Sequence, residues 1–190
     1  MVVSRIHEWV GRHFDPISRR YFVSNGFDGA LTSVGVAFGS YLSGVPEGAI
    51  VVKVGVGAAV GLATSGVWSV WEIERAEKRI ELAEVEAAML ADLTETRVED
   101  RQRERRRLNA VMSGVGPLLG ILVPIAPYLF ATDVFSMLQA TLLAIALGVG
   151  LLFAFGAYMG SISEQSPLVA GARMGLAGLV VAAINVLLPG

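Results

Sequence analysis

The sequence predicts an all-α membrane protein with five transmembrane helices and a cytoplasmic helical hairpin between the second and third. Three observations lead to this fold class. The chain is 54% hydrophobic, and its charged fraction of 17% is well below the roughly 25% of a soluble domain. Of the 15 Lys and Arg residues, four lie in residues 1–20 and nine in residues 73–107. Most of the remaining sequence consists of long apolar segments, which is typical of a multi-pass membrane protein.

Each apolar segment is long enough to cross a hydrocarbon core of roughly 30 Å, which needs about 20 helical residues. None of them alternates strictly between polar and apolar residues, so helices are favoured over strands. The five predicted spans cover residues 21–43, 48–71, 108–131, 134–160 and 167–188. The chain therefore divides into an N-terminal segment (1–20), helices 1–2 (21–71), the hairpin (72–107) and helices 3–5 (108–190).

The distribution of Lys and Arg predicts the orientation. Residues 1–20 and 73–107 hold nearly all of them, and both segments should therefore be cytoplasmic. The loops near Pro46 and Asp133 hold none, which places them outside. With five spans, the N-terminus is cytoplasmic and the C-terminus lies outside. In a prokaryote this would be the plasma membrane. Residues 1–20 have charges where a signal peptide would be apolar, and their helical apolar spacing predicts a short amphipathic helix on the inner surface.

Residues 72–107 form the only sizeable polar segment. The stretch WEIERAEKRIELAEVEAAML has no Gly or Pro, so the second span should continue into the cytoplasm as one long helix. We expect the bend at residues 93–96, where Thr96 and Glu99 fit a capping box that opens the second arm. An apolar stripe that includes Ile73 and Ile80 should pack on the second arm or on a second subunit.

Asp28 is the main candidate for chemistry. It lies eight residues past Arg20, or about 12 Å along a helix, close to the bilayer midplane. A carboxylate there is costly unless it faces protein, water or a cation. One interpretation is a structural aspartate satisfied by Asn25, Thr32 or another span. The other is an ion or proton site, with a transport path lined by Asp28, Asn25, Thr32 and Ser65.

A second candidate is a line of carboxylates on the predicted hairpin. Their spacing of three, four and three residues puts them on one helix stripe. Oxygen ligands suit hard divalent cations, and Fe(II) and Mn(II) accept carboxylates. The stripe is therefore either a metal-gathering site or a solvated acidic face balanced by neighbouring Lys and Arg. Its members are Glu74, Glu77, Glu81 and Glu84.

Other functions find little support in the sequence. The chain has no Cys, no phosphate-binding loop and no buried His that could activate a nucleophile, so we do not expect an enzyme or a tightly bound cofactor. The arginine-rich stretch 97–107 is typical of a solvated, topology-setting surface rather than a nucleic-acid site.

The stretch SNGFDGALTSVGVAFGSYLSG resembles the first transmembrane helix of the vacuolar iron transporter family. The shared pattern is Asp28-Gly29 followed by small and apolar residues up to Ser43-Gly44, and the five-span layout with a charged insert also matches. The resemblance implies a homodimeric Fe(II) or Mn(II) transporter that moves metal out of the cytosol, coupled to protons. Asp28 would carry metal or proton, and the glutamate stripe would gather metal. The alternative is a non-transporting membrane protein of the same fold with a metal-responsive or assembly role.

Overall fold

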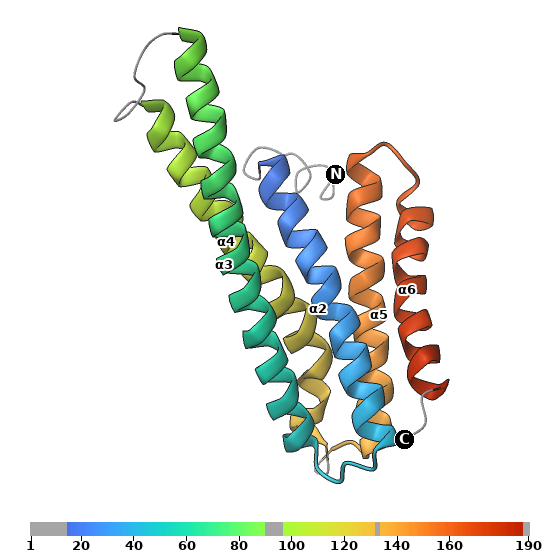
Figure 1. Cartoon of the computed structure of the whole chain (residues 1–190). Helices are drawn as coiled ribbons and strands as arrows, with labels where there is room; N and C mark the ends of the chain where they lie inside the picture. The colour runs from blue at the N-terminus through green and yellow to red at the C-terminus, as the bar shows by residue number, and fades with distance from the viewer. Residues whose placement is uncertain (1–14, 90–96, 132–133, 188–190) are drawn as a thin grey trace.

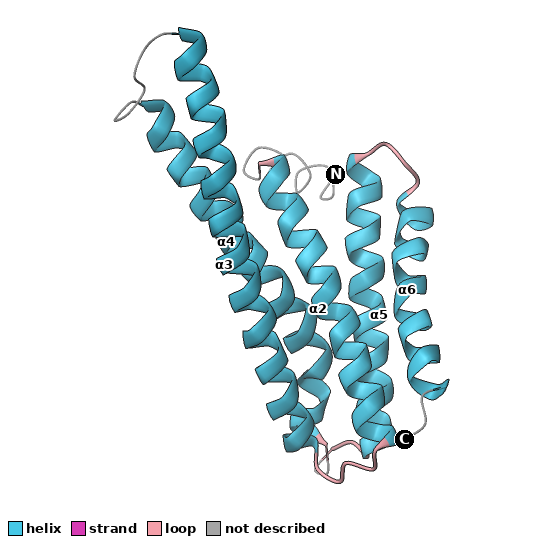
Figure 2. Ribbon diagram, in the orientation of Figure 1, coloured by secondary structure: helices cyan, strands magenta, loops and turns pink. Residues whose placement is uncertain are grey.

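The computed structural model describes residues 15–89, 97–131 and 134–187, and within these ranges the regular structure is helical (Figure 2). The helices follow the predicted apolar segments closely. The described elements are α2 (Pro16–Leu42), α3 (Gly48–Met89), α4 (Arg97–Ile125), the 3₁₀ helix η1 (Ala126–Phe130), α5 (Met137–Ile162) and α6 (Pro167–Leu187). Of the predicted amphipathic segment 1–20, residues 1–14 lie outside the described residues, and residues 16–20 form the first turns of α2 rather than a separate segment.

Helix α3 is a single helix of 42 residues, or about 63 Å. It is roughly twice as long as a membrane crossing needs, so it extends past the ends of α2, α5 and α6 together with the start of α4 (Figure 1). We call residues 72–89 and 97–107 the basic end of the bundle, after the nine Lys and Arg residues that they hold beside nine Asp and Glu residues. The continuous helix agrees with the sequence prediction. The predicted bend at 93–96 lies outside the described residues, and the cytoplasmic placement stays a prediction.

Four helical segments are long and apolar enough to cross a membrane. They lie within α3, in residues 103–130, in α5 and in α6. Helix α2 has 27 residues, which is sufficient length, but Asn25, Asp28 and its Ser and Thr residues make it too polar to qualify by composition. The fifth span therefore remains a prediction.

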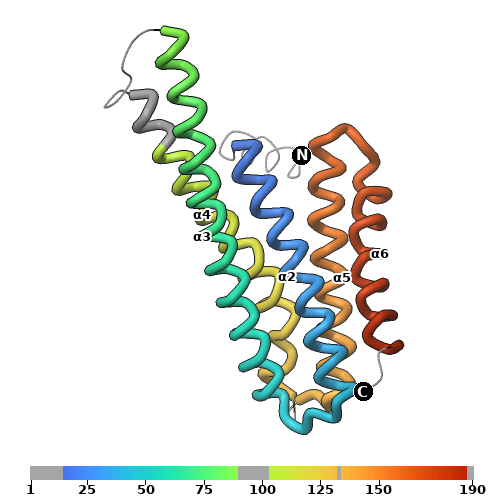
Figure 3. Tube along the Cα trace, viewed as in Figure 1, coloured from blue at the N-terminus to red at the C-terminus, as the bar shows by residue number. Residues whose placement is uncertain are grey.

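Helix α2 lies between the α3–α4 pair and the α5–α6 pair (Figure 3). Glycines let it approach α4 very closely. A Cβ added at Gly120 would lie 2.5 Å from the Gly26 carbonyl oxygen, and one at Gly29 would lie 2.7 Å from the Pro117 Cα. Backbone contact of this kind is how small residues hold membrane helices together.

The prolines of α4 do not break the helix in its middle. It runs through Pro117 and ends at Ile125, where η1 takes over. Proline lacks an N–H, so the Ser113 carbonyl has no helical partner at Pro117. The Asn25 side chain donates a hydrogen bond to that carbonyl, at 3.2 Å, and so compensates for the missing donor.

Candidate functional site on helix α2

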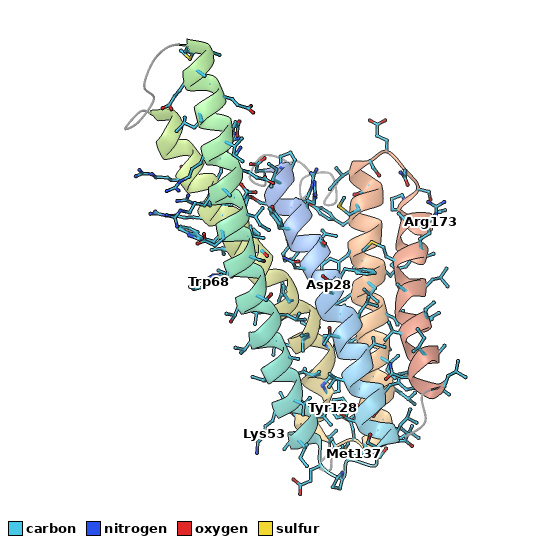
Figure 4. The ribbon with its side chains drawn as sticks, in the orientation of Figure 1. Asp28, Lys53, Trp68, Tyr128, Met137 and Arg173 are labelled. Carbon is cyan, nitrogen blue, oxygen red and sulfur yellow. The ribbon has the colours of Figure 1, made fainter. Side chains whose placement is uncertain are left out.

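Asp28 lies on the face of α2 that the rest of the chain leaves open. The opposite face is buried against α4 and α5 and contains Gly26, Gly29, Ala30 and Ser33. Asp28 and Ser24, one turn away, are both exposed. Figure 4 shows Asp28 between the levels of Arg173 and Lys53, which lie toward opposite ends of the bundle. The polar groups of this face therefore lie partway through the apolar body of the protein.

The Asp28 carboxylate makes no hydrogen bond or ion pair with any residue that the structure describes. Thr32, one turn further, donates its hydroxyl to the Asp28 backbone oxygen at 2.8 Å. This bond occupies the Thr32 proton and leaves its oxygen lone pairs available. Asp28 and Thr32 thus share one stretch of helix surface, with two kinds of oxygen on it.

Asn25 and Ser65 do not join this surface. The Asn25 amide bonds Ser113 of α4, to both its carbonyl and its hydroxyl, so it is occupied on another side of α2. Ser65 is exposed on α3, and the described hydrogen bonds do not link it to Asp28. Of the four predicted path residues, the structure therefore brings together only Asp28 and Thr32.

Sequence reasoning missed Asn185, near the end of α6. A Cβ at Gly35 would lie 3.9 Å from its amide nitrogen, and a Cβ at Gly39 would lie 3.9 Å from its amide oxygen. Its amide nitrogen also donates to the Val181 carbonyl at 2.9 Å. A polar side chain thus lies beside α2 two to three turns beyond Asp28, and its lone position in an apolar helix was the available signal.

Three side chains of α2 form hydrogen bonds that fix its half nearest the basic end. Ser18 donates to Asn109 of α4 at 2.5 Å, and the Tyr21 hydroxyl donates to Glu74 of α3 at 3.2 Å. The Asn25–Ser113 pair is the third. Ser18 and Tyr21 were not singled out in the sequence, although their spacing of seven and four residues from Asn25 places all three on one helix face.

The glutamate stripe is divided by this packing. Glu74 is only 4% exposed and accepts from Tyr21, whereas the other members are exposed. Glu81 is paired with Lys78. Within the described ranges, no three Asp, Glu or His side chains lie close enough to hold a metal ion. One copy of the chain therefore offers separate carboxylates here.

Two members of the apolar stripe on the α3 extension are largely exposed. Ile73 is 48% exposed and Ile80 is 61% exposed. The described residues therefore leave about half of each side chain uncovered, and both predicted partners of the stripe, the second arm and a second subunit, stay predictions.

The fold and composition define a multi-pass helical integral membrane protein. Residues 69–189 match the VIT family, and the chain belongs to this family. Its members are membrane transporters rather than enzymes, so the family indicates metal transport across a membrane, in agreement with the resemblance found in the first helix. The matched residues begin after α2, so Asp28 lies outside them.

The chain is also similar to an uncharacterized protein of Methanocaldococcus jannaschii. The two are 24% identical over 166 residues, which cover 86% of this chain and 84% of the relative. The similarity extends over most of both chains and assigns no substrate.

Proposed function

We propose that the protein moves Fe(II) or Mn(II) out of the cytosol in exchange for protons, with α2 as its fifth span. The observation that carries this proposal is the Asp28 carboxylate, which lies on the open face of α2 without a partner among the described residues. An aspartate facing lipid at the helix centre costs about 2.5–3.5 kcal/mol or more. A carboxylate at this depth therefore points to a bound proton or cation.

The open face needs a polar or aqueous cover, and a second copy of the chain supplies one. Two α2 helices related by a two-fold axis would bring their Asp28 carboxylates to opposite walls of one path. The exposed Ile73 and Ile80 on α3 give the same dimer an apolar contact at the basic end. Both surfaces are uncovered in one chain, which supports the homodimer.

The exchange follows from carboxylate chemistry. A carboxylate oxygen that holds a proton is a poor ligand, and one that binds a divalent cation does not retain its proton. Thr32 and Ser24 add hydroxyl oxygens within one turn of Asp28. An oxygen-rich site without sulfur suits Fe(II) or Mn(II), although it discriminates poorly between them.

The exposed glutamates of α3 would deliver metal to this path. The Tyr21–Glu74 bond joins the first member of the glutamate stripe to α2, which supports this role. In a dimer, the stripes of two copies could supply the ligand number that one copy lacks. We therefore place a weak collecting site there and the exchange site at Asp28.

The test is Mn(II) flux into proteoliposomes under an imposed pH gradient. We expect Asp28→Asn to fold and insert but to lose at least tenfold of the flux. Glu47→Gln removes one exposed carboxylate from the loop before α3 and is the matched control. Wild-type flux in folded Asp28→Asn would refute the mechanism. A complete lack of flux in the wild-type protein would favour the non-transporting alternative.

A further inference from the structure

A strongly basic pocket lies between α3 and α4 at the basic end. It has a volume of about 430 Å³. Trp71 and Leu82 also line it, but no Asp or Glu does. Its six cationic side chains come from both helices and are Arg75, Lys78, Arg79, Arg103, Arg106 and Arg107.

Neighbouring carboxylates pair with part of the positive charge of this pocket. Lys78 pairs with Glu81, and the nearest contact of Arg75 with Glu72 is 3.8 Å, which is long for an ion pair. The Arg106 guanidinium lies 4.4 Å from the centroid of the Trp71 ring, and this stacking holds it in place. Its Nε is buried without a hydrogen-bond acceptor among the described residues. The pocket therefore keeps cationic groups without a described carboxylate partner, Arg106 among them.

The residues next to the pocket are typical of the lipid headgroup level. Trp68 is 73% exposed on α3 and precedes the first pocket residue, Trp71, by one turn. Exposed Trp residues at the end of an apolar helix mark the membrane interface. On α4, Arg107 directly precedes the apolar run that begins at Leu108. Both helices thus enter the hydrocarbon region next to the pocket.

An apolar groove of about 390 Å³ continues from the pocket along the same two helices. Its lining includes Trp68 on α3 and Val111 on α4. On α3, groove and pocket residues follow each other at steps of four and three, so they form one stripe. The positions are Thr64, Trp68, Trp71, Arg75 and Lys78.

This groove lies apart from the Asp28 surface. Figure 4 shows Trp68 on the side of α3 that is turned away from α2. Glu74, by contrast, is turned toward α2, where it bonds Tyr21. The two sides of α3 therefore face different surfaces, and a ligand in the basic pocket would be separate from an ion bound at Asp28.

We propose that the outer α3–α4 groove binds an anionic phospholipid, with its phosphate in the basic pocket and an acyl chain along the apolar groove. Arginine guanidinium groups bind phosphate oxygens through paired N–H donors. The adjoining apolar groove and its position at the headgroup level favour a lipid over a soluble phosphate. A lipid held in this way bridges α3 and α4 and stabilises the two arms against each other.

The experiment measures dioleoyl phosphatidylglycerol binding to the purified full chain in a neutral detergent by native mass spectrometry. The zwitterionic dioleoyl phosphatidylcholine is the reference lipid. Arg75→Gln/Arg106→Gln should weaken phosphatidylglycerol binding about 30-fold, since each surface Lys or Arg contributes about 1 kcal/mol and 1.4 kcal/mol is tenfold. Each single variant should bind phosphatidylglycerol about fivefold more weakly than the wild type. If the double variant fails to fold, the two single variants carry the test.

Lys53→Gln/Arg173→Gln is the matched control, because it removes two exposed cations from elsewhere on the protein. It should bind phosphatidylglycerol like the wild type. Three results would overturn the proposal. The first is an equal loss of phosphatidylglycerol binding in the two double variants, and the second is equal binding of both lipids by the wild type. The third is displacement of phosphatidylglycerol by pyrophosphate at a concentration similar to that of the lipid. The last would show a soluble phosphate site instead.

Discussion

Because α2 and α4 are in close contact, we predict that one added methyl group between them lowers the free energy of unfolding markedly. A Cβ in Gly120→Ala would lie 2.5 Å from the Gly26 carbonyl oxygen and 2.8 Å from the Ala30 nitrogen. Ordinary contact begins at 3.4 Å, so α2 would have to move by almost 1 Å. Both neighbours are backbone atoms, which cannot rotate away. Overpacking of this kind costs about 3 kcal/mol at the upper end of its range. Because alanine favours the helix by about 1 kcal/mol, a net loss of about 2 kcal/mol remains.

Gly61→Ala on α3 is the matched comparison. A Cβ at Gly61 meets nothing within 4 Å, so only the gain of about 1 kcal/mol in helix propensity applies. The two variants should therefore differ by about 3 kcal/mol, with opposite signs relative to wild type. Tryptophan fluorescence during unfolding in mixed micelles measures both. If Gly120→Ala were as stable as Gly61→Ala, the close packing of α2 on α4 would be wrong.

Three further results are expected. Tyr21→Phe should lower the free energy of unfolding by about 1–3 kcal/mol, because it leaves the buried Glu74 carboxylate without its donor; an unchanged unfolding midpoint would contradict this. Ser24→Cys, in a chain without native cysteine, should form a disulfide-linked dimer under mild oxidation, whereas Leu176→Cys on the exposed face of α6 should not. A third variant replaces Glu77, Glu81 and Glu84 of the glutamate stripe by Gln. It should bind less Mn(II) in calorimetry with unchanged helicity, and full Mn(II) binding would mean that the stripe is only a solvated face.

The elements were predictable because their cause is local. Long apolar runs specify helices of membrane length, and the uninterrupted sequence beyond Trp71 specifies that α3 continues. The start of α2 was less clear, because Arg19 and Arg20 precede the apolar run and the predicted span begins at residue 21. The structure instead begins α2 at Pro16, a position that proline favours in the first turn of a helix.

The site was predictable only in part, because the orientation of a side chain depends on its neighbours in space. Asn25 and Asp28 are three residues apart and seemed to share a cavity. Pro117 leaves the Ser113 carbonyl without its helical donor, and Asn25 fills that position. The exposure of Ile73 and Ile80 likewise depends on where α4 crosses α3. The local sequence around these residues encodes neither the hydrogen bond of Asn25 nor the exposure of Ile73 and Ile80.

The central claim is that Asp28 exchanges a proton for a metal ion. Its most direct test records Mn(II) entry and internal pH together in proteoliposomes that carry a pH-sensitive dye. For the wild type, we predict that Mn(II) entry drives proton exit and that reversing the pH gradient reverses the metal flux. Folded Asp28→Asn should show neither signal. Proton-coupled Mn(II) entry in Asp28→Asn, or metal entry without proton movement in the wild type, would contradict the account.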